Sequence, residues 1–263
     1  MVRYPAPAKL NLFLHVVGRR ADGYHLLQTA FTFIDRRDFL TFALRSDDRI
    51  VRVDGPPDIS PDEDLCFRAA KLLRAKSGVS KGVSIGLEKH LPWGAGLGGG
   101  SSDAATTLIV LNHLWNLELN REELQTIGLE LGADVPVFIF GRSAIAEGVG
   151  EKLTAIEVPK AWYVVLTPPV HVPTKTVFAD PELTRDSIPI KISDFSSAVF
   201  RNDLEAVSIR RFPEVGHYLQ WLSEYSPARM TGSGSAVFAA FSDQAGAEKV
   251  LANLPDGMKG FVA

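Results

Sequence analysis

The sequence predicts an α+β protein built from two domains, and three observations lead to that fold class. With 263 residues, the chain is long enough for one large domain or two modest ones. Its first part mixes strand-like and helix-like periodicity around one glycine-rich loop. Near Val158-Pro159 the pattern resets, and the order strand, helices, strand, helix, strand is typical of a small α+β domain with an antiparallel sheet. We therefore expect domains at residues 1–157 and 158–263.

The first predicted strand covers Ala8–Val16, where every second residue is apolar and is expected in the core. Lys9 and Asn11 lie on the opposite face, and spacing alone favours a solvent-facing position for this pair. Further strands are expected in an apolar run ending at Ile34, at 39–44 after a hairpin turn over Asp35–Asp38, at 50–53 and at 82–89.

Helices in the first part are predicted from capping residues and apolar periodicity. Asp64 can cap a helix over 65–76. Asn120 and Glu123 have the spacing of a capping box, for a helix that stops at Gly132. A third helix is expected over 104–115, and a β-hairpin over 143–156.

The second part begins with a predicted strand at 162–167 and a proline-stiffened loop that carries Phe178. Residues 180–190 are polar and interrupted by proline, so we expect an exposed excursion there. The remaining elements are expected as helices at 194–207, 213–222 and 245–254, and as strands at 236–241 and 260–262.

The glycine-rich loop, Pro92–Ala104, is the most informative stretch of the sequence. Five glycines fall within seven residues, and Ser101, Ser102 and Asp103 follow at once. Glycine lets successive backbone N–H groups converge on one anion, and a helix that begins at the serines adds its own free N–H groups. The loop therefore predicts a phosphate-binding site. A flexible loop with a serine cap is the alternative, and it explains the adjoining apolar helix less well.

The loop also contains the spacing Gly94-x-Gly96-x-x-Gly99, which matches the dinucleotide-binding fingerprint. Its context disfavours a dinucleotide-dependent oxidoreductase, because polar residues and Pro92 separate the glycines from the preceding strand. No Lys-Ser or Lys-Thr follows the glycines, so this is not a Walker A loop.

Asp134 stands out in the segment Gly132-Ala-Asp-Val-Pro136, just past a predicted helix end. Apolar neighbours and Pro136 favour a defined, partly buried position for its carboxylate. An aspartate that only makes a turn is the common alternative.

Composition excludes several classes of protein. A net charge of −3 with mixed signs gives no nucleic-acid or membrane footprint, so neither kind of partner is expected. The single cysteine, Cys66, rules out an intrachain disulfide and suits a reducing compartment. No apolar signal core and no apolar run of 18 residues occur, and we expect a cytoplasmic protein. The oligomeric state is not indicated.

Three segments of the chain resemble, in the expected order, the characteristic segments of the GHMP kinases. They are Pro7-Ala-Lys-Leu-Asn-Leu12, the loop Pro92–Ala104, and Met230-Thr-Gly-Ser-Gly-Ser-Ala236. The resemblance covers nearly the whole chain. It implies a two-domain GHMP kinase fold, with an N-terminal mixed α/β domain carrying the ATP loop, a C-terminal ferredoxin-like α+β domain, and the active site in the cleft between them. Trp93 is bulkier than the Val or Met expected at its position.

The resemblance also implies roles for individual residues. Asp134 would be the general base and Lys9 the cation beside the acceptor hydroxyl, so that Lys9 and Asn11 would face the cleft. ATP and Mg²⁺ would be required, although no metal ligand is indicated. The residues expected to bind ATP are Lys89, Pro92, Gly94, Ala95, Gly96, Leu97, Gly98, Gly99, Gly100, Ser101 and Ser102.

Within the family, the string Asp22-Gly-Tyr-His-Leu26 is most similar to kinases of the non-mevalonate isoprenoid pathway, whose acceptor carries cytidine diphosphate. That similarity implies that Tyr24 and Phe178 stack on the cytosine, with a contribution of about 1–3 kcal/mol per base. His25 would read the base edge, and Asn11 would also bind the substrate. A mevalonate- or homoserine-type kinase and a catalytically silent binding protein are the alternatives. The first does not need Tyr24-His25, and the second does not need Lys9 with Asp134.

Overall fold

The computed structural model describes residues 2–55, 60, 63–191 and 200–263, and it divides the chain into two compact units. Unit 1 contains Met1–Ala8, Asp35–Leu91 and Gly98–Arg142, and unit 2 contains Lys9–Ile34, Pro92–Leu97 and Ser143–Ala263. The first two strands, β1 (Arg3–Arg19) and β2 (His25–Arg45), each contribute residues to both units. The expected boundary at residue 157 stays a prediction.

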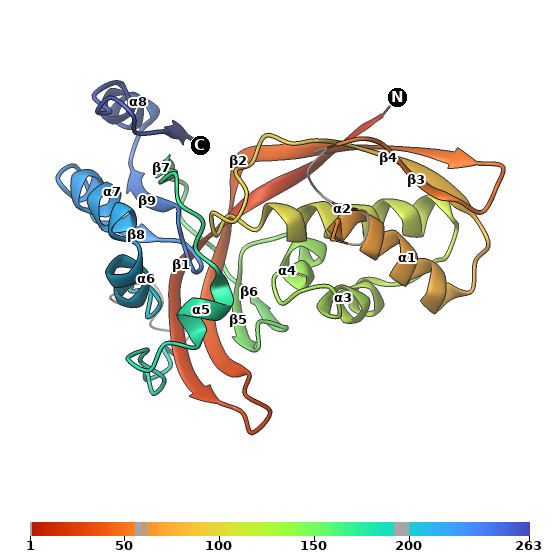
Figure 1. The fold of residues 1–263 in the computed structure, drawn as a ribbon, viewed down its shortest axis with the longest axis horizontal. Coiled ribbons are helices and arrows are strands. Elements are labelled where there is room, and N and C mark those ends of the chain that lie inside the picture. The colour runs from red at the N-terminus through yellow and green to blue at the C-terminus, as the bar shows by residue number, and fades with distance from the viewer. Residues whose placement is uncertain (1, 56–59, 61–62, 192–199) are drawn as a thin grey trace. The chain divides into compact units, whose positions relative to one another are not determined.

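Unit 1 is a small mixed sheet with four helices. The C-terminal part of β2 pairs antiparallel with β4 (Gly82–Glu88), from Phe39 opposite Glu88 to Arg45 opposite Gly82, and β4 pairs parallel with β3 (Ile50–Asp54). The helices α1 (Leu65–Ser77), α2 (Gly99–Leu114), α3 (Arg121–Leu129) and α4 (Val135–Phe140) lie on one side of β3 and β4 (Figure 1).

Both predicted helix caps in unit 1 are confirmed. The Asp64 side chain accepts hydrogen bonds from the backbone N–H groups of Cys66 and Phe67 at the start of α1. At the start of α3, Asn120 and Glu123 form a reciprocal capping box. Each cap satisfies N–H groups that have no partner within the helix, so local sequence alone defines where these helices begin.

In unit 2, β2 pairs antiparallel with β5 (Ala144–Gly148), which pairs with β6 (Lys152–Ala155), as the predicted hairpin requires. A second, antiparallel sheet has the order β10-β7-β9-β8 and consists of β7 (Trp162–Leu166), β8 (Ala228–Met230), β9 (Val237–Phe241) and β10 (Gly260–Val262). The helices of this unit are α5 (Thr174–Phe178), α6 (Glu205–Arg211), α7 (Pro213–Ser223) and α8 (Gln244–Ala252).

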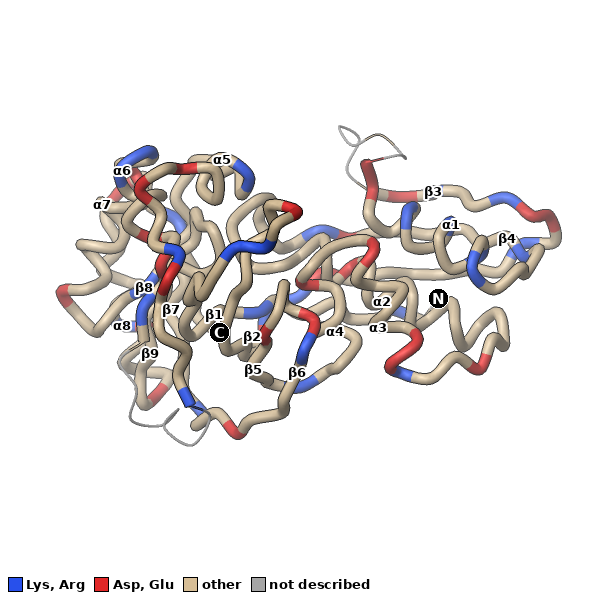
Figure 2. The backbone as a smooth tube through the Cα atoms, turned by 90° about the horizontal axis from the view of Figure 1, so that it is seen from below, with Lys and Arg blue, Asp and Glu red and all other residues tan. Residues whose placement is uncertain are grey.

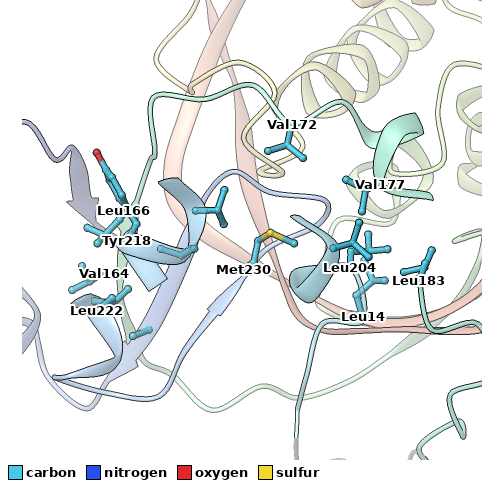
Figure 3. Close-up of a cluster of buried hydrophobic side chains, with 14 of the residues drawn as sticks. Leu14, Val164, Leu166, Val172, Val177, Leu183, Leu204, Tyr218, Leu222 and Met230 are labelled. Atoms are coloured by element: carbon cyan, nitrogen blue, oxygen red, sulfur yellow. The ribbon is translucent and has the colours of Figure 1, made fainter. Parts of the chain in front are cut away.

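The core of unit 2 joins β1 to this second sheet and its helices (Figure 3). Leu14 and Val16 of β1 are buried in the same cluster as Val164 of β7, Leu222 of α7 and Met230 of β8. An antiparallel sheet with helices packed on it is the α+β arrangement expected for the C-terminal part of the sequence.

Several sequence predictions were wrong in detail. The hairpin turn expected over Asp35–Asp38 does not form, because β2 runs unbroken from His25 to Arg45. The loop carrying Phe178 contains the short helix α5. In the segment 180–190, expected to be an exposed excursion, six of the eleven residues are exposed, whereas Asp180, Leu183 and Ser187 are buried, so that prediction holds only in part.

One further expectation is resolved only in part. Helix α6 begins at Glu205, so residues 200–204 are not helical as predicted for 194–207, and the stretch 194–199 lies outside the described residues. Basic and acidic residues are interspersed along the backbone (Figure 2), in keeping with the small net charge. Within the described ranges, no helix is both long and apolar enough to cross a membrane.

Candidate functional site

Three distant segments of the sequence meet in unit 2. The backbone N–H of Lys9 in β1 donates to the carbonyl of Leu97 in the glycine-rich loop at 3.0 Å. The N–H of Ala236, in the second Gly/Ser-rich loop, donates to the carbonyl of Ala95 at 3.1 Å. The first half of the glycine-rich loop therefore lies between the N-terminal strand and the loop that follows β8.

Side chains complete this junction. Lys9 and Asn11 are both buried, with exposed fractions of 1% and 3%, so the solvent-facing position favoured by spacing is wrong. The Lys9 ammonium donates to Asn11 Oδ1 at 2.5 Å, and Thr231 donates to the same oxygen at 3.2 Å. Asn11 Nδ2 donates to Thr29 Oγ1 at 2.9 Å. The position of the Lys9 charge is thus set by an amide whose own orientation is fixed by two threonines.

Gly96 is required at this junction for two physical reasons. Its φ of 74° lies in the left-handed region, which disfavours residues with a Cβ. A Cβ at this position would also collide with the backbone carbonyl oxygen of Thr231. The close approach of the two loops therefore depends on the missing side chain, and the Thr231 hydroxyl oxygen lies 3.3 Å from the Gly96 carbonyl oxygen.

The remainder of the glycine-rich loop belongs to unit 1, where it starts helix α2. Gly98 is the N-cap residue, with φ 73°, and no side chain caps the helix. The first N–H groups of α2 are consequently left without partners inside the helix, as at any helix N-terminus, and they carry its positive end. The Ser102 hydroxyl is buried and has no hydrogen-bond partner in the part of the chain that the structure describes. This geometry suits a phosphate group.

Lys89 lies beside this helix start and contacts two buried carboxylates. Its ammonium donates to Asp38 at 2.5 Å and to Asp103 at 2.8 Å. The other oxygen of Asp38 accepts from the backbone N–H groups of His90 at 2.6 Å and Leu91 at 2.8 Å. A Cβ on Gly99 would lie 3.0 Å from the Lys89 ammonium. We call Asp38, Lys89 and Asp103 the carboxylate–lysine triad; it ties β2 to the entry of the loop and to the first turns of α2.

Burial changes the ionisation of the triad. It raises the pKa of Asp103 to about 7, against the opposing effect of Lys89, and the Asp38 charge raises it further. Burial alone would lower the pKa of Lys89, but the two carboxylates raise it overall. Lys89 is therefore the permanently charged member, and Asp103 is the one that can change its charge near neutral pH.

Asp134 is half-buried and precedes helix α4, in agreement with the partly buried position predicted from its neighbours. The turn that carries it approaches the start of α2, since a Cβ on Gly132 would lie 3.8 Å from the Ser101 hydroxyl. Within unit 1, a carboxylate thus lies on the turn adjoining the free N–H groups of α2.

The predicted base-binding residues lie in unit 2. The rings of His25 and Phe178 stack with centroids 4.9 Å apart and planes at 30°. Tyr24 is 66% exposed beside them in the sequence, at the turn between β1 and β2. Burial, together with the charges of Arg185 and Arg19, lowers the pKa of His25, so its imidazole is neutral near pH 7. The stack joins two of the three aromatic residues expected to bind the base.

The loop residues predicted to bind ATP are divided between the two units. Pro92, Gly94, Ala95, Gly96 and Leu97 belong to unit 2, where Trp93 is 52% exposed, whereas Gly98, Gly99, Gly100, Ser101 and Ser102 belong to unit 1.

Sequence reasoning missed three residues that organise these sites, namely Asp38, Thr231 and Arg185. Asp38 had the appearance of a turn residue, and Arg185 lies in the segment expected to be exposed. Only Thr231 had a signal, since it belongs to the second Gly/Ser-rich loop.

Comparison with known proteins gives the class to which this fold and these loops belong. A family model described as the GHMP kinases N terminal domain matches residues 64–142, and one described as GHMP kinases C terminal matches residues 186–260. A 4-diphosphocytidyl-2-C-methyl-D-erythritol kinase of Thiobacillus denitrificans is 60% identical over 260 residues, which cover 99% of this chain and 94% of the relative. One of Aromatoleum aromaticum is 55% identical, with coverage of 98% and 91%. The protein is therefore a small-molecule kinase.

Solved structures agree with this class. A crystal structure of 4-(cytidine 5'-diphospho)-2C-methyl-D-erythritol kinase has a TM-score of 0.85 at 36% identity and covers 99% of this chain and 98% of its own. The Methanococcus jannaschii mevalonate kinase has a TM-score of 0.72 at 16% identity, with coverage of 99% and 97%, which shows the shared fold alone. The chain belongs to the GHMP kinase family, and its similarity within that family is to the cytidyl-methylerythritol kinases named above. The predicted fold class, kinase activity and family resemblance are confirmed.

Proposed function

We propose that this chain transfers the γ-phosphoryl group of ATP to the 2-hydroxyl of 4-diphosphocytidyl-2-C-methyl-D-erythritol, in the non-mevalonate route to isoprenoid precursors. Support comes from relatives of that name at 60% and 55% identity over almost the entire chain. The stacked His25 and Phe178 rings add a feature suited to a pyrimidine base. A mevalonate- or homoserine-type acceptor has no base to occupy such rings. A cytoplasmic location stays a prediction.

ATP is expected to bind along the glycine-rich loop. The N–H groups at the start of α2 would hold phosphate oxygens, and the glycines from Gly94 to Gly100 would let phosphate approach the backbone. Lys89 was expected on the nucleoside side. Its contacts with Asp38 and Asp103 favour a different contribution, in which it holds the loop's entry and α2 in register.

For the chemical step, we assign the acceptor's orientation and deprotonation to Asp134. The acceptor oxygen forms a bond to the γ-phosphorus, the bond from that phosphorus to the β–γ bridging oxygen breaks, and ADP leaves. The hydroxyl proton passes to the Asp134 carboxylate. The Lys9 ammonium, oriented by Asn11, would stabilise negative charge on the transferring group.

Mg²⁺ is expected to accompany ATP and to neutralise phosphate charge. Among the described residues, no group of three or more His, Cys, Asp or Glu side chains could hold a metal ion. The described residues would therefore suit a Mg²⁺ ion that is held mainly by phosphate oxygens and water, with one or two protein oxygens. The Ser101 hydroxyl, at the uncapped start of α2, is the protein oxygen we propose.

One observation carries the assignment of Asp134: its turn adjoins the phosphate-type helix start, through Gly132 and Ser101. Asp134→Asn keeps the shape and one acceptor oxygen but removes the charge and the basicity. We expect kcat to fall by about 10²–10⁴-fold with little change in either KM. If proton transfer lags behind the breaking of the phosphorus–oxygen bond, the loss will lie at the lower end.

Single-turnover phosphoryl transfer measures this loss without interference from product release. Glu130→Gln is the matched control, because this acidic side chain is half-exposed, lies four residues away and pairs with Lys76. It should leave the rate unchanged. An Asp134→Asn enzyme within threefold of wild type would remove Asp134 from the mechanism. Equal turnover of mevalonate and the cytidine-bearing acceptor would refute the proposed substrate, and no turnover with either would favour a silent binding protein.

A further inference from the structure

Arg185 makes four hydrogen bonds, one to a stacked ring of unit 2 and three to nearby backbone carbonyls. Its Nε donates to His25 Nε2 at 3.1 Å. One terminal nitrogen donates to the carbonyls of Phe178 at 3.0 Å and Asp180 at 2.7 Å, and the other to that of Leu183 at 3.0 Å. A single guanidinium therefore contacts the imidazole of His25 and the backbone at the end of α5, which carries the Phe178 ring.

The chemistry of the guanidinium determines where the His25 proton lies. Arginine can only donate hydrogen bonds and stays charged, so His25 Nε2 must accept. A neutral imidazole that accepts at Nε2 carries its proton on Nδ1. Burial and the neighbouring cations disfavour the doubly protonated ring. Within the described part of the chain, Nδ1 makes no hydrogen bond, so its N–H is available to a ligand.

We propose that Arg185 is a positioning residue that fixes His25 as the Nδ1–H tautomer, so that the ring offers a hydrogen-bond donor to the pyrimidine base of the acceptor. This inference rests on the proposed cytidine-bearing acceptor. Cytosine has acceptor atoms on its edge, the carbonyl oxygen and the unprotonated ring nitrogen, and these suit a donor. The opposite tautomer would present an acceptor, which can bind only the exocyclic amino group.

The test begins with the free protein. Nitrogen-15 spectra of histidine-labelled enzyme distinguish the two neutral tautomers directly. Wild type should show His25 as Nδ1–H. Arg185→Met, which cannot donate, should release the ring to the Nε2–H form that neutral histidine prefers in water. Arg185→Lys keeps a donor and should retain the Nδ1–H form at least in part. Lys175→Met is the matched control, because Lys175 is an exposed cation of α5 with no hydrogen bond to either ring.

Steady-state kinetics supply the second readout. For Arg185→Met we expect the KM of the cytidine-bearing acceptor to rise about tenfold, as for one lost hydrogen bond. The KM of ATP and kcat should stay within twofold, and Lys175→Met should match wild type. Arg185→Lys should recover most of the acceptor affinity. A merely structural role would change the KM of ATP and kcat together with the KM of the acceptor.

The inference is overturned if wild-type His25 is the Nε2–H tautomer, or if Arg185→Met changes neither the tautomer nor the acceptor KM. If Arg185→Met does not fold, a folded Arg185→Lys enzyme with the Nε2–H form overturns it equally. The spectra require no acceptor, so a failure of this inference can be distinguished from a failure of the proposed function. A wrong tautomer refutes the role of Arg185, whereas an absence of turnover with the cytidine-bearing acceptor refutes the proposed function.

Discussion

Replacing Asp38 by asparagine tests the carboxylate–lysine triad most sharply. Asp38 is fully buried, and the substitution keeps one oxygen for the N–H groups of His90 and Leu91. It replaces the oxygen that accepts from Lys89 with an NH₂ group, so two donors then face each other. Removing one partner of a buried ion pair costs about 3–5 kcal/mol. Because the backbone contacts persist and Asp103 still pairs with Lys89, we expect about 3 kcal/mol, the lower end of that range.

The measurement is the free energy of unfolding in urea, with the dependence on denaturant checked to be unchanged. Asp35→Asn is the matched control on the same strand, because Asp35 is 76% exposed and pairs with Arg37 at the surface. It should cost less than about 1 kcal/mol. An Asp38→Asn protein within about 0.5 kcal/mol of wild type would refute the account of the triad.

The destabilisation should also depend on pH, with a definite sign. In wild type the pKa of Asp103 is raised to about 7, so the neutral form is favoured and stability is lost as pH rises towards and through 7. Part of that rise comes from the Asp38 charge, which the variant lacks. The variant should therefore lose less stability over the same range, and the difference from wild type should shrink between pH 6 and pH 8. A difference that grows over this range would contradict the assignment.

Two further predictions concern the ligand sites. Gly98→Val places a β-branched residue at φ 73°, where phosphate must approach the backbone. ATP affinity measured by calorimetry should therefore fall at least tenfold, while the protein still folds. Unchanged affinity would mean that the phosphate site lies elsewhere. Tyr24→Ala removes an exposed ring expected to stack on the base. The KM of the acceptor should rise about tenfold, in keeping with about 1–3 kcal/mol of stacking, and the KM of ATP should stay constant. A parallel change in both KM values would point to a folding defect.

Local signals predicted the starts of α1 and α3 well, whereas α2 begins at Gly99, two residues before the serines expected to start it. Asp64 and Asn120 cap helices through contacts within three residues, so the sequence contains the whole interaction. Such features depend on neighbours in the chain and can be recognised without a structure.

The features that sequence reasoning missed depend on distant partners. In the sequence Asp38 resembles a turn residue. Its partners are the Lys89 ammonium and the backbone N–H groups of His90 and Leu91, which lie 51 to 53 residues further along the chain. Lys9 and Asn11 are buried because Thr231 lies against them, 220 residues away from Asn11. Arg185 contacts His25 across 160 residues. A polar residue buried by a remote partner has no local sequence pattern. For that reason only the family resemblance predicted that Lys9 does not face solvent.

The interleaving of the two units along the chain has a consequence for synthesis on the ribosome. Unit 1 has all of its residues once Arg142 has emerged, whereas unit 2 needs the chain up to Ala263. Unit 1 can therefore fold while the second half of the chain is still being made, in the way that N-terminal parts often fold first. During that interval residues 27–31 of β2 lack their partner β5, and Lys9 and Asn11 lack Thr231. The nascent chain thus carries an unpaired strand edge, and its Lys9 ammonium lies beside an Asn11 that has not yet met Thr231. A chaperone that binds exposed strands could bind the chain at this stage.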